Sequence, residues 1–186
     1  MRFPDDKQEG SHRTSAPAET PTVAFATDGC VMASWGNLIL VAWGIQSSLS
    51  LVDELRRLIT RVAGEHTKIS LVHVCIGALP LPTKEVRGAF ASMTHEFADK
   101  LSCVGVSIGE EGFWASAVRS VVTHLQSISQ RGPKAQLCGS VEEVSTYMAR
   151  AHVTEAGVLV DARALHQALE SLLAHPQLRG FGGTSA

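Results

Sequence analysis

Apolar and polar positions recur along the chain with two spacings, one typical of strands and one typical of helices. Near the N-terminus, two β-rich runs at 31–35 and 38–43 are joined by Gly36-Asn37. This two-residue link predicts a tight hairpin, because glycine accepts positive φ and asparagine tolerates it. Residues 23–26 predict a short edge strand before the hairpin.

Beyond the hairpin, β-rich runs alternate with helical stripes. Ser50 is a candidate N-cap for a helix that ends near Gly64. Residues 68–76 carry apolar side chains on both faces, as a central strand covered on each side does. The same analysis predicts strands at 101–108 and 135–138, and helices at 84–100, 113–129, 140–150 and 161–174. Because β-α-β crossovers place their strands parallel, this order predicts an α/β layered domain with a mixed, mostly parallel sheet.

The two ends of the chain differ in composition from its centre. Residues 1–21 are rich in Pro, Ser, Thr and charged side chains without apolar periodicity, which predicts a disordered tail. We expect the α/β domain to occupy residues 22–152. Residues 153–186 are expected to form an appended C-terminal helix followed by a glycine-rich, flexible tail.

Four stretches carry a resemblance to a known family, namely 35–43 (WGNLILVAW), 69–76, 101–108 and 135–148, where SVEEV opens a helix. Over residues 30–150, the pattern and the order of elements resemble a STAS-like domain of the SpoIIAA-like (STAS/SEC14-like) branch. The resemblance implies the STAS-like layered fold. It also implies a non-enzymatic regulatory or adaptor protein that acts by protein–protein interaction. The partner would be a kinase, a sensor or a second copy of this chain in a homodimer.

The resemblance further implies a phospho-acceptor at the start of the helix that follows the central strand. In this chain the position falls at 77–83, where only Thr83 can accept phosphate. The family's pattern there contains Asp followed by Ser or Thr, and this stretch has no Asp. Thr83 is therefore the candidate phospho-acceptor, and its alternative role is that of a plain helix N-cap.

Charge and hydropathy narrow the classes of partner. Sixteen basic and eighteen acidic residues give a formal net charge of -2 at pH 7. Nucleic-acid and anionic-membrane binders generally use a basic surplus, so neither partner is expected. Gly, Asn, Gln and Ser interrupt the uncharged stretch 29–52, so no membrane span is expected. Four widely spaced cysteines and the lack of an apolar leader before residue 21 predict a cytoplasmic protein with free, buried thiols.

The sequence lacks the usual patterns of catalytic and metal sites. None of the eight histidines forms a local ligand pair and the cysteines have no CxxC spacing, so no metal and no cofactor are expected. There is no GxSxG elbow. Glu110-Glu111 has no second carboxylate cluster to support it and is interpreted as a solvated turn. We therefore expect no enzymatic activity. His73, in mid-strand, is interpreted as a hydrogen-bonded core residue.

Aromatic residues offer the remaining candidate site. Trp43, Phe113 and Trp114 could line a partner or ligand groove where the sheet meets the helix at 113–129, and their ordinary interpretation is core or rim packing. Such a groove supports an alternative function, a carrier or sensor of a small apolar (lipid-like) ligand in a pocket between helix and sheet. An adaptor should show a shallow surface, whereas a carrier should show an enclosed apolar pocket.

Overall fold

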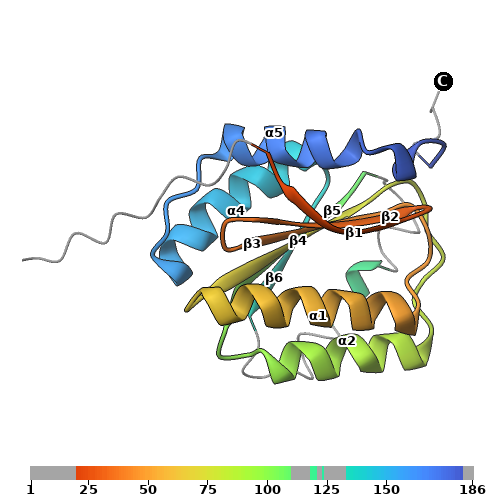
Figure 1. The fold of residues 1–186 in the computed structure, drawn as a ribbon, viewed down its shortest axis with the longest axis horizontal. Coiled ribbons are helices and arrows are strands. Elements are labelled where there is room, and N and C mark those ends of the chain that lie inside the picture. Colours follow the sequence, from red (N-terminus) through yellow and green to blue (C-terminus); the bar gives the residue numbers. More distant parts are fainter. Residues whose placement is uncertain (1–19, 110–117, 121–122, 124–132, 182–186) are drawn as a thin grey trace, which may run out of the picture.

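The structure is a computed structural model that describes residues 20–109, 118–120, 123 and 133–181. It is an α/β fold in which a mixed sheet lies between two helical layers (Figure 1). The strands are adjacent in chain order: β1 (Thr22–Thr27), β2 (Cys30–Trp35), β3 (Leu38–Trp43), β4 (Ile69–Cys75), β5 (Leu101–Ile108) and β6 (Lys134–Cys138). β1, β2 and β3 pair antiparallel, and β3 to β6 pair parallel. The predicted α/β class and mixed sheet are confirmed.

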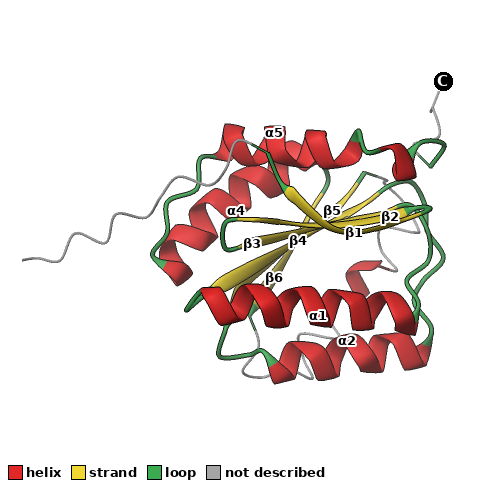
Figure 2. Ribbon diagram, viewed as in Figure 1, coloured by secondary structure: helices red, strands yellow, loops and turns green. Residues whose placement is uncertain are grey.

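Helices cover both faces of the sheet (Figure 2). One layer contains α1 (Leu49–Glu65) and α2 (Lys84–Glu96), and the other contains α4 (Val141–Ala156) and α5 (Ala162–Leu173). Strand side chains alternate between the layers, as the pleat requires. In β4, Leu71 packs in the core with α1 and α2, whereas Val72 and Val74 pack in the core with α4 and α5. The prediction that this strand is central and covered on each side is confirmed.

The predicted hairpin forms as expected. Trp35 is paired with Leu38 across a two-residue turn in which Gly36 has a φ of 59°. This left-handed conformation strains a residue with a Cβ, so glycine suits the position. The turn places β2 and β3 side by side and leaves β3 free to pair with β4 on its other edge.

The predicted N-cap of α1 is wrong by two residues. Ser48, rather than Ser50, has extended backbone geometry, and its hydroxyl accepts a hydrogen bond from the Leu51 N–H over 3.4 Å. Ser50 lies inside the helix, and its hydroxyl lies 2.9 Å from that of Ser48. Both serines have a suitable spacing in the sequence, but only Ser48 lies before the helix with the extended backbone of an N-cap.

Two other helix ends differ from prediction. α2 stops at Glu96, four residues before the predicted end. α4 begins as predicted, since the Ser140 hydroxyl accepts from the Glu143 N–H over 3.1 Å, but it continues to Ala156. It ends at Gly157, whose φ of 69° is the left-handed conformation that terminates many helices. Most of the predicted helix at 113–129 lies outside the described residues.

The C-terminal helix α5 packs directly on the domain. Its buried side chains are Leu165, Ala168, Leu169 and Leu172, which join the core formed by α4 and the sheet. After α5, the chain returns to the start of β2, where the Gln177 carbonyl accepts from the Gly29 N–H over 2.8 Å. The described part of residues 153–186 therefore adds a helix to the second layer.

The cysteine prediction agrees with the structure. Cys30, Cys75, Cys103 and Cys138 all lie on strands and are free thiols, with Cys75 half-buried and the other three buried. Among the described residues, no helix combines the length and apolar character that crossing a membrane requires.

Candidate functional site

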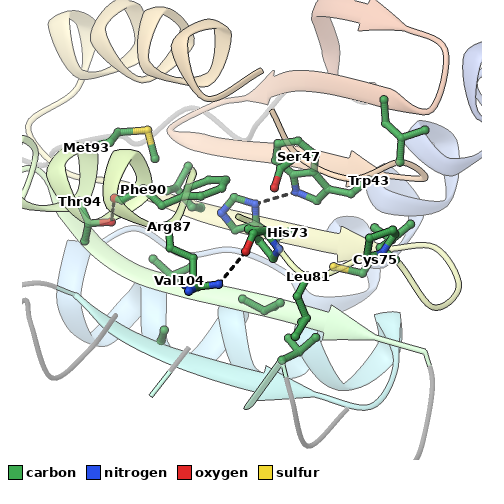
Figure 3. Close-up of a pocket in the computed structure, with 18 of the residues that line it drawn as sticks. Trp43, Ser47, His73, Cys75, Leu81, Arg87, Phe90, Met93, Thr94 and Val104 are labelled. Carbon is green, nitrogen blue, oxygen red and sulfur yellow. Dashed lines mark hydrogen bonds between the residues drawn. The ribbon is translucent and has the colours of Figure 1, made fainter. Parts of the chain in front are cut away.

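A pocket of about 190 Å³ lies between α2 and the sheet face that α1 and α2 cover (Figure 3). The end of β3, residues 71–75 of β4, the middle of β5 and the start of β6 form its floor. Its remaining walls come from α2 and from the loop at 79–82, with Val118 and Pro133 also contributing. Most of these side chains are apolar, among them Leu71, Leu79, Phe90, Met93, Val104 and Val106.

Strand alternation brings these floor residues together. Leu71, His73 and Cys75 occupy every second position of β4 and so share one face. Val104 and Val106 lie on the same face of the neighbouring strand, because Val106 is paired with His73 in parallel register. The floor of the pocket thus follows from the alternation and parallel pairing of neighbouring strands.

An aromatic cluster forms one end of the pocket. The rings of Trp43 and His73 are stacked with centroids 6.1 Å apart, and Phe90 meets both rings edge-on at 6.2 and 6.5 Å. The Trp43 Nε1–H donates to His73 Nδ1 over 3.1 Å. An imidazole nitrogen that accepts carries no proton, so the neutral ring carries its proton on Nε2.

The titratable groups of the floor are uncharged at neutral pH. Burial lowers the pKa of His73 to about 4, because the imidazolium loses its hydration. Burial likewise raises the pKa of the Cys75 thiol to about 12. No Asp or Glu occurs among the described residues that line the pocket, and Arg87 is the only Lys or Arg among them.

Two hydrogen bonds hold the loop at 79–82 against the pocket. Arg87 donates from its guanidinium to the Pro82 carbonyl over 2.7 Å. The Gln46 side-chain amide donates to the Leu81 carbonyl, also over 2.7 Å. The loop is therefore fixed both to α2 and to the segment that follows β3.

Of the four site residues predicted from the sequence, one lines the pocket, one lies beside it and two lie outside the described residues. Trp43 lines the pocket. Phe113 and Trp114 lie outside the described residues. Thr83 is exposed directly after the pocket loop, and its hydroxyl caps α2 by accepting from the Val86 N–H over 3.4 Å.

Of the residues that line the pocket, only Trp43 was predicted from the sequence as a site residue, and the polar and aromatic residues His73, Arg87 and Phe90 are among those that were missed. His73 is hydrogen-bonded, as interpreted, but it also lines the pocket. Phe90 and Arg87 lie in a helix that was predicted. Nothing in the sequence indicates that this side of the helix faces a pocket over the sheet. The sequence did carry one signal for His73. β4 consists of apolar residues, one serine, one cysteine and this histidine, and a histidine is unusual in such a strand.

A serine, a histidine and an asparagine also meet inside the protein, at the opposite layer. Ser70 and His152 are both 0% exposed, and Asn37 is buried. A substrate has no access to side chains enclosed in this way, so this group is structural. Among the described residues, no three His, Cys, Asp or Glu side chains are grouped as metal ligands.

Comparison with known proteins identifies no relative: no family model, no curated protein and no solved structure matches this chain.

Proposed function

We propose that this chain is a non-enzymatic, STAS-like protein that binds a small apolar molecule in the pocket between α2 and the sheet, as a carrier or sensor. The observation that carries the proposal is the pocket itself, an apolar cavity whose histidine and cysteine are both neutral. Pockets with this character are typical of ligand sites.

The size of the pocket restricts the ligand. Its volume of about 190 Å³ is somewhat larger than the ~150 Å³ of an apolar cavity that binds benzene. It is smaller than the roughly 300 Å³ at which sites for drug-sized molecules begin. A ring with a short substituent fits these bounds, whereas a long acyl chain exceeds them.

The chemistry of the pocket argues against catalysis. A thiol with a pKa of about 12 is a poor nucleophile at neutral pH, since the thiolate is the reactive species. His73 Nδ1 accepts from Trp43, so it is not available as a general base. The described lining residues also include no carboxylate that could orient the imidazole.

The STAS-like assignment is supported by the order of elements, an N-terminal hairpin followed by parallel β-α units. A second candidate function is the regulatory adaptor that binds a protein partner, for which the exposed Thr83 beside the pocket loop is the relevant feature.

The free thiols are in keeping with a cytoplasmic location, which we include in the proposal.

Thermal unfolding with and without isobutylbenzene tests ligand binding. A ligand at about ten times its Kd stabilises the folded state by roughly 1.4 kcal/mol, which raises Tm by about 3–6 °C. Val104→Phe fills the pocket and should abolish this rise. Val23→Phe makes the same change at an exposed position and should retain it. Absence of any rise in the wild type, or an undiminished rise in Val104→Phe, would contradict the proposal.

A further inference from the structure

The polar groups of the pocket show which kind of ligand it accepts. His73 Nε2 carries the ring proton, because Nδ1 accepts from Trp43. No described residue forms a hydrogen bond with this Nε2. Nor is Nε2 among the described side-chain nitrogen and oxygen atoms that are both shielded from solvent and without a hydrogen-bond partner. Because His73 lines the pocket, its Nε2–H is a hydrogen-bond donor that a bound ligand can use.

Arg87 offers further donors and a positive charge. One of its five N–H groups is occupied by the Pro82 carbonyl. Within the described part of the chain, no carboxylate lies at ion-pair distance from Arg87. Glu85 interacts with the charge of Arg87 but forms no ion pair with it. The remaining guanidinium N–H groups can therefore bind an anion, and guanidinium pairs especially well with carboxylate.

The other polar side chains that line the pocket add no charge. The Thr94 hydroxyl donates to the Phe90 carbonyl over 2.9 Å, and Ser47 adds one more hydroxyl. A ligand group that fits the neutral His73 donor and the single cation Arg87 is an acceptor with one negative charge. A phosphate with two charges would lack a second cation in a largely apolar cavity, which is costly.

We propose that the ligand is a small monocarboxylic acid, with its ring or short chain on the apolar floor and its carboxylate bound by Arg87 and by His73 Nε2–H. This inference rests on the proposed function and adds the chemical class of the ligand. His73 acts as a neutral donor, so it contributes specificity without changing its protonation state.

Calorimetric titration with two probes of the same shape tests this inference. Phenylacetate carries the carboxylate, and isobutylbenzene replaces it with an apolar group. We expect the wild type to bind phenylacetate at least tenfold more tightly than isobutylbenzene. Arg87→Met and His73→Phe should each weaken phenylacetate binding at least tenfold and change isobutylbenzene binding by less than threefold. Lys84→Met removes an exposed cation of α2 that does not line the pocket, and should leave both affinities unchanged.

The outcomes separate the two proposals. If isobutylbenzene binds and phenylacetate binds no more tightly, the carboxylate inference is overturned and the apolar-ligand function stands. If neither probe binds, both fail. Tight phenylacetate binding by Arg87→Met would also overturn the inference. His73→Phe also removes the acceptor for Trp43, so NMR of the wild type labelled with ¹⁵N-histidine provides a second measurement. The His73 Nε2 signal should shift with phenylacetate and not with isobutylbenzene. An unchanged signal with phenylacetate would overturn the carboxylate inference.

Discussion

His152 Nε2 donates a hydrogen bond to the Oδ1 atom of Asn37 over 3.0 Å, although 115 residues separate the two side chains. The direction is fixed because Asn37 Nδ2 donates to the Lys68 carbonyl, which leaves Oδ1 as the acceptor. His152 Nδ1 then accepts from the Ser70 hydroxyl over 2.8 Å. One chain of hydrogen bonds thus joins α4, the β2–β3 turn and the start of β4.

Acid should destabilise the fold through this buried histidine. Burial lowers the pKa of His152 from 6.5 to about 4. Above pH 6.5 the ring is neutral in both states, so it has no effect on stability there. As pH falls from 6.5 towards 4, the unfolded chain takes up the proton and the folded protein does not. The free energy of unfolding should therefore fall by roughly 2–3 kcal/mol per such histidine at pH 4.5.

Urea unfolding at pH 7.5 and 4.5 measures this contribution. His152→Gln removes the titration. The stability that this variant loses between the two pH values should therefore be smaller than the wild-type loss by roughly 2–3 kcal/mol. His95→Gln, at an exposed position of α2, should lose as much as the wild type. Equal losses in all three proteins would show that His152 does not remain neutral in the folded state.

Close packing of α4 on the sheet depends on Gly105. A Cβ at this position would lie 2.6 Å from Val144 Cγ2 and 2.9 Å from Met148 Sδ. Gly105→Ala should therefore lower the free energy of unfolding by about 2 kcal/mol. Gly88→Ala is the control, since nothing lies within 4 Å of its Cβ position in α2 and alanine favours a helix interior by about 0.5–1 kcal/mol. The two substitutions should have opposite signs in urea unfolding, and equal signs would contradict the packing argument.

The order of the elements could be predicted because each one has a local cause. β5 was predicted to the residue, since its apolar run is bounded by polar and glycine residues. The hairpin followed from Gly36-Asn37 and the start of α4 from Ser140. Helix ends were predicted less well, because α1 offers two serines and α4 contains no internal signal to stop before Gly157.

The site could be predicted only in part because it depends on distant residues. Trp43 was named as a candidate, but the side chains that accompany it come from β4, β5 and α2, and their grouping depends on strand register. The role of Asn37 was likewise hidden. Its place in the turn was evident, whereas its bond to a histidine in α4 requires the tertiary fold.

The ion pair between α1 and α2 should contribute little to stability. Arg56 Nε lies 3.1 Å from Glu96 Oε2, and the Glu96 side chain is 49% exposed. Exposed pairs are screened by solvent and are usually worth less than 1 kcal/mol. Glu96→Gln should therefore lower the free energy of unfolding by less than 1 kcal/mol at low salt, with no measurable difference at 1 M NaCl. A larger loss that persists in high salt would mean that the pair acts as a buried one.

Alkylation of Cys75 should report on the pocket. With a pKa of about 12, its thiolate fraction at pH 7.5 is about 3 in 100,000, so iodoacetamide should react about a thousandfold more slowly than with an exposed thiol. The rate should rise about tenfold per pH unit from pH 7 to 9.5, because only the thiolate reacts. Saturating isobutylbenzene should slow it further, since Cys75 lines the pocket. Mass spectrometry of the Cys75 peptide measures the rate, and a rate that begins to level off between pH 8.5 and 9.5 would indicate an ordinary, solvated thiol.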